Sequence, residues 1–95
     1  MIKTIVKACC GNQVTIYQPG SPIRKFQVRV FKENGYSVPD NFYNAGIFYV
    51  FKGSVIATAS FGTSKISVRA GKDQAALTTL IEFESLLEQA VLLKQ

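Results

Sequence analysis

The stretch of sequence that decides the fold lies near the C-terminal end of the chain, where the spacing of apolar residues changes. Residues 73–94 have the sequence DQAALTTLIEFESLLEQAVLLK. Apolar residues recur here every three or four positions, which predicts an amphipathic helix with Asp73 as its N-cap. The stripe expected to face the core consists of Ala76, Leu77, Leu80, Phe83, Leu87, Ala90 and Val91.

The apolar arc of this helix is wider than one sheet face needs to cover. Four apolar residues lie outside the stripe: Ile81, Leu86, Leu92 and Leu93. An exposed leucine forgoes roughly 1.5 to 3 kcal/mol of burial. We therefore expect these four residues to form the interface of a homodimer, while noting that scattered surface leucines are also ordinary in monomers.

Before residue 73, apolar and polar residues alternate with a period of two, which is typical of half-buried β-strands. Glycine, asparagine and proline separate the alternating runs and predict turns between them. The fold class predicted is α+β, with an antiparallel β-sheet of about five to six strands followed by one C-terminal amphipathic helix, in a single domain over 1–95. The predicted strands are 2–9, a strand containing Val14 and Ile16, 23–32, 47–51, 54–60 and a short segment around Ile66 and Val68.

Charge divides the chain into two parts. The whole chain has a net charge of +5. Residues 1–72 hold ten of the eleven basic residues and two of the six acids, a net charge of +8, whereas one base and four acids give residues 73–95 a net charge of −3. The predicted sheet is therefore basic, and a basic surface attracts polyanions through the release of counterions.

Basic and aromatic side chains share the outward positions of the predicted strands. In the 23–32 strand, the pattern places Phe26, Val28 and Val30 on the core side. Unpaired bases stack on aromatic rings for about 1 to 3 kcal/mol each, so the sequence predicts a protein that binds single-stranded DNA or RNA largely independently of sequence. The predicted nucleic-acid-binding residues are Lys25, Arg29, Phe31, Tyr49, Phe51, Lys52, Lys65 and Arg69.

Other classes of function find little support in the composition. The chain has no histidine and few acids outside the helix, so we expect no enzyme activity and no cofactor. Its two cysteines, Cys9 and Cys10, are neighbours, expected to be reduced thiols and unable to complete a zinc site. No apolar run approaches the roughly 20 residues that span a bilayer, so a cytoplasmic protein without a membrane partner is expected.

Two families of single-stranded DNA-binding protein resemble parts of this chain. The segments FQVRV at 26–30, NG at 34–35, YNAGIFYV at 43–50 and FGT at 61–63 resemble the gene five DNA-binding proteins of filamentous phages. FKG at 51–53 and KISV at 65–68, leading into a terminal helix, are similar to the coactivator positive cofactor four. Both resemblances imply a dimer that binds single strands; the first implies a five-stranded barrel without a long helix, the second a curved four-stranded sheet with dimerising helices.

A second interpretation of the sequence is a small protein of the phage or plasmid type that binds and inhibits or regulates a host protein. The aromatic residues Tyr36, Phe42 and Tyr43 lie in a predicted loop, and such residues are enriched in contacts with protein as well as with nucleic acid. Salt separates the two interpretations, because phosphate contacts weaken steeply with salt and aromatic protein contacts do not.

Overall fold

The computed structural model describes residues 1–7, 11–41 and 45–94. It contains a five-stranded antiparallel sheet followed by a C-terminal helix, which confirms the predicted α+β class. The expectations about Cys9, Cys10, Phe42 and Tyr43 concern positions outside the described residues. No helix in the described ranges is long and apolar enough to cross a membrane.

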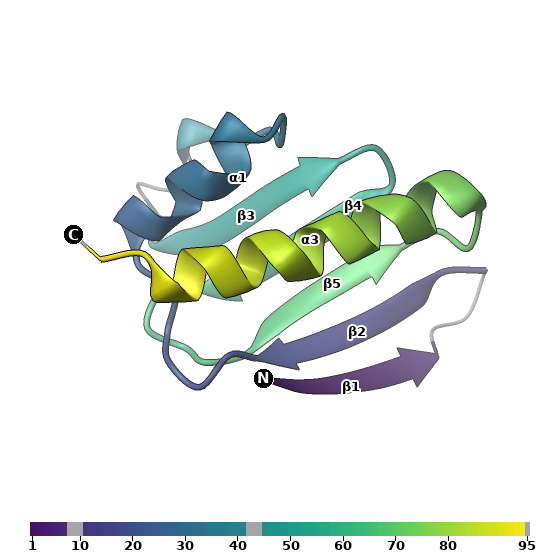
Figure 1. The fold of residues 1–95 in the computed structure, drawn as a ribbon, viewed down its shortest axis with the longest axis horizontal. Helices are drawn as coiled ribbons and strands as arrows, with labels where there is room; N and C mark the ends of the chain where they lie inside the picture. Colours follow the sequence, from purple (N-terminus) through teal and green to yellow (C-terminus); the bar gives the residue numbers. More distant parts are fainter. Residues whose placement is uncertain (8–10, 42–44, 95) are drawn as a thin grey trace.

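The sheet has the strand order β1-β2-β5-β4-β3, so its two edges are β1 and β3 (Figure 1). Every neighbouring pair is antiparallel. Between β3 and β4, Lys52 pairs with Val55, so the tight turn consists of Gly53 and Ser54, one residue later than the pattern suggests. The strands are β1 (Ile2–Lys7), β2 (Gln13–Gln18), β3 (Ile47–Lys52), β4 (Val55–Ser60) and β5 (Ile66–Ala70).

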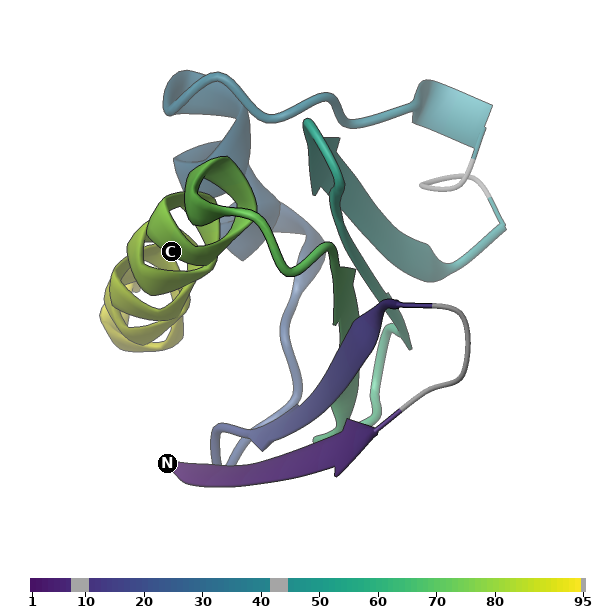
Figure 2. The same cartoon turned by 90° about the vertical axis from the view of Figure 1, so that its right-hand side faces the viewer.

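A layer of helices covers one face of the sheet. The long helix α3 (Gln74–Leu92) packs along the sheet, and the short helices η1 (Lys25–Val28) and α1 (Arg29–Glu33) lie beside it (Figure 1). The sheet is curved, and Figure 2 shows its β1–β2 end bending toward the α3 side. The core fills the space between this helical layer and the sheet.

Helix α3 begins as the sequence predicts, but its buried arc is rotated. The Asp73 carboxylate accepts a hydrogen bond from the backbone N–H of Ala76 at 3.3 Å, which satisfies one of the free donors at the helix start. Leu86, expected in a dimer interface, is only 5% exposed, whereas Leu77, expected in the core, is 39% exposed. The shift has a physical cause: η1 and α1 cover a second flank of α3, so the buried arc turns toward them.

The predicted strand at 23–32 is wrong, because residues 25–33 are helical. Their buried residues, Gln27, Val28 and Phe31, are spaced as on a helix. The end of α1 explains the outcome: Gly35 adopts a φ of 87°, its N–H donates to the Lys32 carbonyl, and the Tyr36 N–H donates to the Phe31 carbonyl. This pair of bonds is the Schellman ending of a helix, which glycine favours.

An aromatic cluster joins the helical layer to the sheet. The Phe31 ring lies 5.2 Å from Phe83 of α3 and 5.6 Å from both Phe48 of β3 and Tyr36, measured between ring centroids. Phe31, Phe48 and Phe83 are at most 1% exposed. Phe48 and Phe83 therefore belong to the core, as the sequence predicts for Phe83, while Phe26, also expected there, is only half-buried.

The two edges of the sheet differ. At β3, Ser37 forms a bridge with Phe51, in which the Ser37 N–H donates to the Phe51 carbonyl at 2.9 Å and the Phe51 N–H donates back at 3.1 Å. At the other edge, β1 is paired with β2 alone. Part of the β3 edge is thus occupied, whereas no described strand pairs with the outer edge of β1.

Candidate nucleic-acid interface

On the face of the sheet opposite the helices lie the side chains of every second residue in each strand. Because side chains alternate across a strand, the burial of Phe48, Val50, Ile66 and Val68 against the helical layer directs their neighbours to the other side. We call this second side the outward face. Two rows cross it through the strand register: Phe51, Ile56, Arg69, Val14 and Val6, and then Tyr49, Thr58, Ser67, Ile16 and Thr4.

Aromatic rings occupy the β3 end of both rows. The Tyr49 and Phe51 rings are 5.7 Å apart and meet edge to face at 71°. Both side chains are half-buried, and Arg69 is exposed two strands away in the same row as Phe51. Neighbouring strands are about 4.8 Å apart, so the backbones at Phe51 and Arg69 are separated by about 10 Å.

The charge of the outward face is positive. Arg69 lies in the middle of the sheet, and the exposed Lys65 precedes β5 at a position that shares the parity of Ser67 and Arg69. In the described strands, no aspartate or glutamate occupies an outward position. A polyanion approaching this face therefore meets no repelling carboxylate there.

Four of the eight predicted residues lie elsewhere. Phe31 is fully buried in the aromatic cluster and cannot stack on a base, which corrects the expectation that it faces outward. Lys25 and Arg29 are exposed, but they belong to η1 and α1 on the helical side. The Lys25 ammonium lies 6.0 Å from the centroid of the Phe61 ring.

Lys52, the fourth, is held on the helical side. Its ammonium lies 2.9 Å from the Glu82 carboxylate, donates to the Asn34 carbonyl at 3.2 Å and sits 5.3 Å from the centroid of the Tyr36 ring. Burial, and then the charge of Glu82, raise the pKa of the Tyr36 hydroxyl. These contacts fasten the end of β3 to α1 and α3, so Lys52 has a structural role that the sequence does not reveal.

A second polar cluster fastens the other end of the sheet to α3. The Tyr17 hydroxyl donates to the Glu84 carboxylate at 2.8 Å, and the Lys3 ammonium pairs with the same carboxylate. Burial raises the pKa of Glu84, but the hydrogen bonds from Lys3 and Tyr17 outweigh it, and the net pKa is lowered. Burial, and then Glu84, raise the pKa of Tyr17. This arrangement keeps Glu84 ionised on the helical side, away from the outward face.

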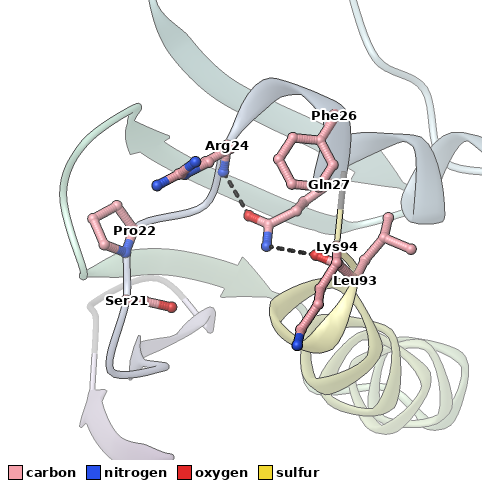
Figure 3. Close-up of a pocket in the computed structure, with 7 residues that line it drawn as sticks. All are labelled: Ser21, Pro22, Arg24, Phe26, Gln27, Leu93 and Lys94. Atoms are coloured by element: carbon pink, nitrogen blue, oxygen red, sulfur yellow. Dashed lines mark hydrogen bonds between the residues drawn. The ribbon is translucent and has the colours of Figure 1, made fainter.

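A hollow of about 320 Å³ lies between the start of η1 and the end of α3 (Figure 3). The Gln27 carboxamide crosses it, accepting from the Arg24 N–H at 2.7 Å and donating to the Leu93 carbonyl at 3.4 Å. Arg24 and Lys94 also line the hollow, but Figure 3 shows their side chains extending in different directions. The Gln27 hydrogen bonds therefore join two helices, and the hollow offers no convergent set of ligands.

The outward face also contains residues that the sequence does not single out as a site. Thr58 and Ser67 are paired neighbours on β4 and β5, and Val14 and Ile16 continue the rows on β2. The alternation within each strand predicts which of these side chains lie on the same side of that strand. Their meeting in two rows depends on the register and on the β2–β5 pairing, which local sequence does not specify.

Comparisons with known proteins give no assignment. A scan against protein-family models matched no family, and searches of curated proteins and of solved structures found no match.

Proposed function

We propose that this chain binds single-stranded nucleic acid, largely independently of sequence, through the outward face of its sheet. The observation that supports the proposal is the row in which Phe51, Ile56 and Arg69 lie on three adjacent strands, with no outward carboxylate in the described strands. The half-buried rings offer stacking surface to unpaired bases, and the cation offers a phosphate contact. Bases of a duplex are already stacked on one another, so we expect a preference for single strands.

The second row supplies further phosphate ligands. The hydroxyls of Thr58 and Ser67 lie side by side between Tyr49 and the β2 end of the face. Hydroxyl groups commonly donate to phosphate oxygens and carry no sequence information by themselves. Stacking on Tyr49 is likewise tolerant of base identity, which is why we expect little sequence preference.

The first experiment measures fluorescence anisotropy of labelled single-stranded and duplex oligonucleotides with the full chain, at low and at physiological salt. We expect micromolar or tighter binding that favours the single strand. With two cations in contact with phosphates, the logarithm of the affinity should fall with the logarithm of salt concentration with a slope of about −1.4. Absence of binding at low salt would refute the proposal.

A matched pair of variants tests the face itself. Arg69→Glu and Arg29→Glu change the net charge equally, but one lies on the outward face and the other on α1. We expect Arg69→Glu to weaken binding at least about tenfold and to make the salt slope about 0.7 shallower, since one phosphate contact is lost. Arg29→Glu should change the affinity less than about threefold. Equal effects would mean that net charge alone governs binding.

A protein partner is the second candidate function, in line with a small phage- or plasmid-type regulator of a host protein. The specific observation in its favour is the apolar β1–β2 end of the outward face, where Val6 is exposed and Val14 and Ile16 are half-buried. Binding of a protein through these residues would be little affected by salt, because it would rest on apolar burial.

A further inference from the structure

Exposed apolar side chains are concentrated on two elements. Among the described residues, all seven large apolar side chains that are exposed belong either to residues 1–6 or to α3. The most exposed are Leu92 at 78%, Ile81 at 70% and Ile2 at 62%. A small protein rarely leaves so many apolar side chains together in water unless they form a contact.

Five of these side chains meet along the boundary between β1 and α3, whereas Ile2 and Val6 lie on the outward face of β1. Ile5 of β1 shares a hollow of about 330 Å³ with Leu77, Leu80 and Ile81 of α3. Farther along, a hollow of about 270 Å³ brings Met1 together with Leu92. The Lys3–Glu84 ion pair, whose two residues line the first hollow, bridges the same boundary. We call this boundary the β1–α3 groove; it runs beside the outer edge of β1, with which no described strand pairs.

We propose that a second copy of this chain occupies this surface, with the two β1 strands paired antiparallel about a two-fold axis at Thr4 and the β1–α3 grooves of both copies flanking the axis. The product is a continuous ten-stranded sheet. An exposed strand edge is a ready template for pairing, and two-fold dimers are the commonest symmetric assembly.

The sequence of β1 selects this register. Residues opposite one another in an antiparallel pair share a face, so with Thr4 on the axis, Ile2 meets Val6 of the second copy and Lys3 meets Ile5. On the outward face every pair is then apolar or Thr4 against itself. Moving the axis by one residue, to Lys3 or to Ile5, places lysines opposite one another, which destabilises a strand pair.

Charge also fits on the helical side of the pair. Lys3 already has Glu84 as a partner, so its ammonium brings no uncompensated charge into the contact. Its aliphatic stem can then pack on Ile5 of the second copy, as lysine stems commonly do on apolar surface. Ile5 in turn continues into the groove that contains Ile81. The contact therefore covers apolar side chains on both sides of the new strand pair.

The oligomeric state of the full chain tests the proposal. Sedimentation velocity from about 1 to about 200 µM, without nucleic acid, should show a species of twice the 10.5 kDa chain mass. A single species of chain mass over the whole range would overturn the proposal. The result is independent of the proposed function, because no oligonucleotide is present and binding is measured separately.

Two double variants test the register. Both I2E/V6E and I2E/V6K remove the same apolar side chains from exposed positions, so the fold should survive. In I2E/V6E, carboxylates of the two copies face one another, and we expect the dissociation constant of the dimer to rise at least about 100-fold. In I2E/V6K, the carboxylate at position 2 faces an ammonium at position 6 of the second copy, which should recover about tenfold. Equal dissociation constants for the two variants would overturn this register.

A single pair of variants tests the helical wall of the groove. Ile81→Glu places a charge in the groove, whereas Gln89→Glu places the same charge at an exposed position elsewhere on α3. We expect about a tenfold weaker dimer for Ile81→Glu and no change for Gln89→Glu. A dimer that is equally stable in both variants would exclude the groove from the interface.

Discussion

Replacing Phe31 by alanine distinguishes the observed fold from the strand that the sequence suggests at this position. On a solvent-facing strand, the substitution would change the free energy of unfolding by no more than about 0.5 kcal/mol. In the structure, Phe31 is 0% exposed and contacts the rings of Tyr36, Phe48 and Phe83 at 5.2 to 5.6 Å. Core Phe→Ala substitutions cost about 3 to 5 kcal/mol, and each lost aromatic pair adds to the cost of apolar burial.

This loss is large relative to the whole stability of a small domain, about 5 kcal/mol or somewhat more. Urea unfolding followed by far-ultraviolet circular dichroism gives the measurement. With a slope of about 1 to 3 kcal/mol per molar urea, a loss of about 3 kcal/mol lowers the midpoint by about 1 to 3 M. Lys32→Ala, in the same helix but exposed, is the matched control and should shift the midpoint little.

A milder substitution covers the case in which Phe31→Ala does not fold at all. Phe31→Leu keeps most of the apolar volume and should cost about 1 to 2 kcal/mol, which leaves a measurable transition. If Phe31→Ala and Lys32→Ala unfolded at the same urea concentration with the same slope, the aromatic cluster would not exist as described. Residues 25–33 would then have to be reassigned.

Two further predictions concern the contacts that hold the layers together. The pKa of Glu84 is lowered in the folded chain, so its ionised form stabilises the fold at pH values above the usual pKa of an unfolded glutamate. This contribution is lost as pH falls through the lower pKa of the folded state. The difference in unfolding free energy between the native chain and Glu84→Gln should therefore be below about 1 kcal/mol at about pH 7 and should shrink toward zero as pH falls through the folded-state pKa of Glu84. Urea midpoints at a series of pH values measure this difference, and a constant difference would contradict the linkage. Gly35→Ala should destabilise the chain by about 1 to 2 kcal/mol in thermal unfolding, because the φ of 87° strains any residue with a Cβ, and an unchanged midpoint would argue against the Schellman ending of α1.

Local sequence predicts some elements of this fold well and one badly, and the physical reason differs in each case. The start of α3 follows from Asp73, whose carboxylate caps the helix through a contact only three residues away. The β3–β4 hairpin likewise depends on neighbouring strands and a two-residue turn. Residues 25–33 fit both the periodicity of a strand and that of a helix. Val28 and Val30 alternate as in a strand, while Val28 and Phe31 share one face of a helix. The Gly35 ending and the aromatic cluster decide between them, and the cluster is a tertiary contact.

The candidate site divides in the same way. Tyr49, Phe51 and Arg69 could be assigned an outward position because alternation within one strand is a local property. Lys52 could not be excluded from the sequence, because its partner Glu82 lies thirty residues away. Thr58 and Ser67 could not be grouped with Tyr49 without knowing which strands pair. The sequence thus indicates that a basic and aromatic surface exists, whereas the strand order and register decide which residues form it.

The hydrogen-bonded bridge between Ser37 and Phe51 limits what a strand-paired assembly of this protein can become. A chain with two open edges could add copies at both ends and grow into a fibre. Here the backbone groups of Phe51 that a further strand would need are already used by Ser37. In the proposed dimer, pairing through β1 uses the outer edge of that strand in each copy, and the Ser37 bridge already occupies part of the β3 edge at the far end of each sheet. A further copy could therefore not pair along the full length of β3, which disfavours growth beyond two copies.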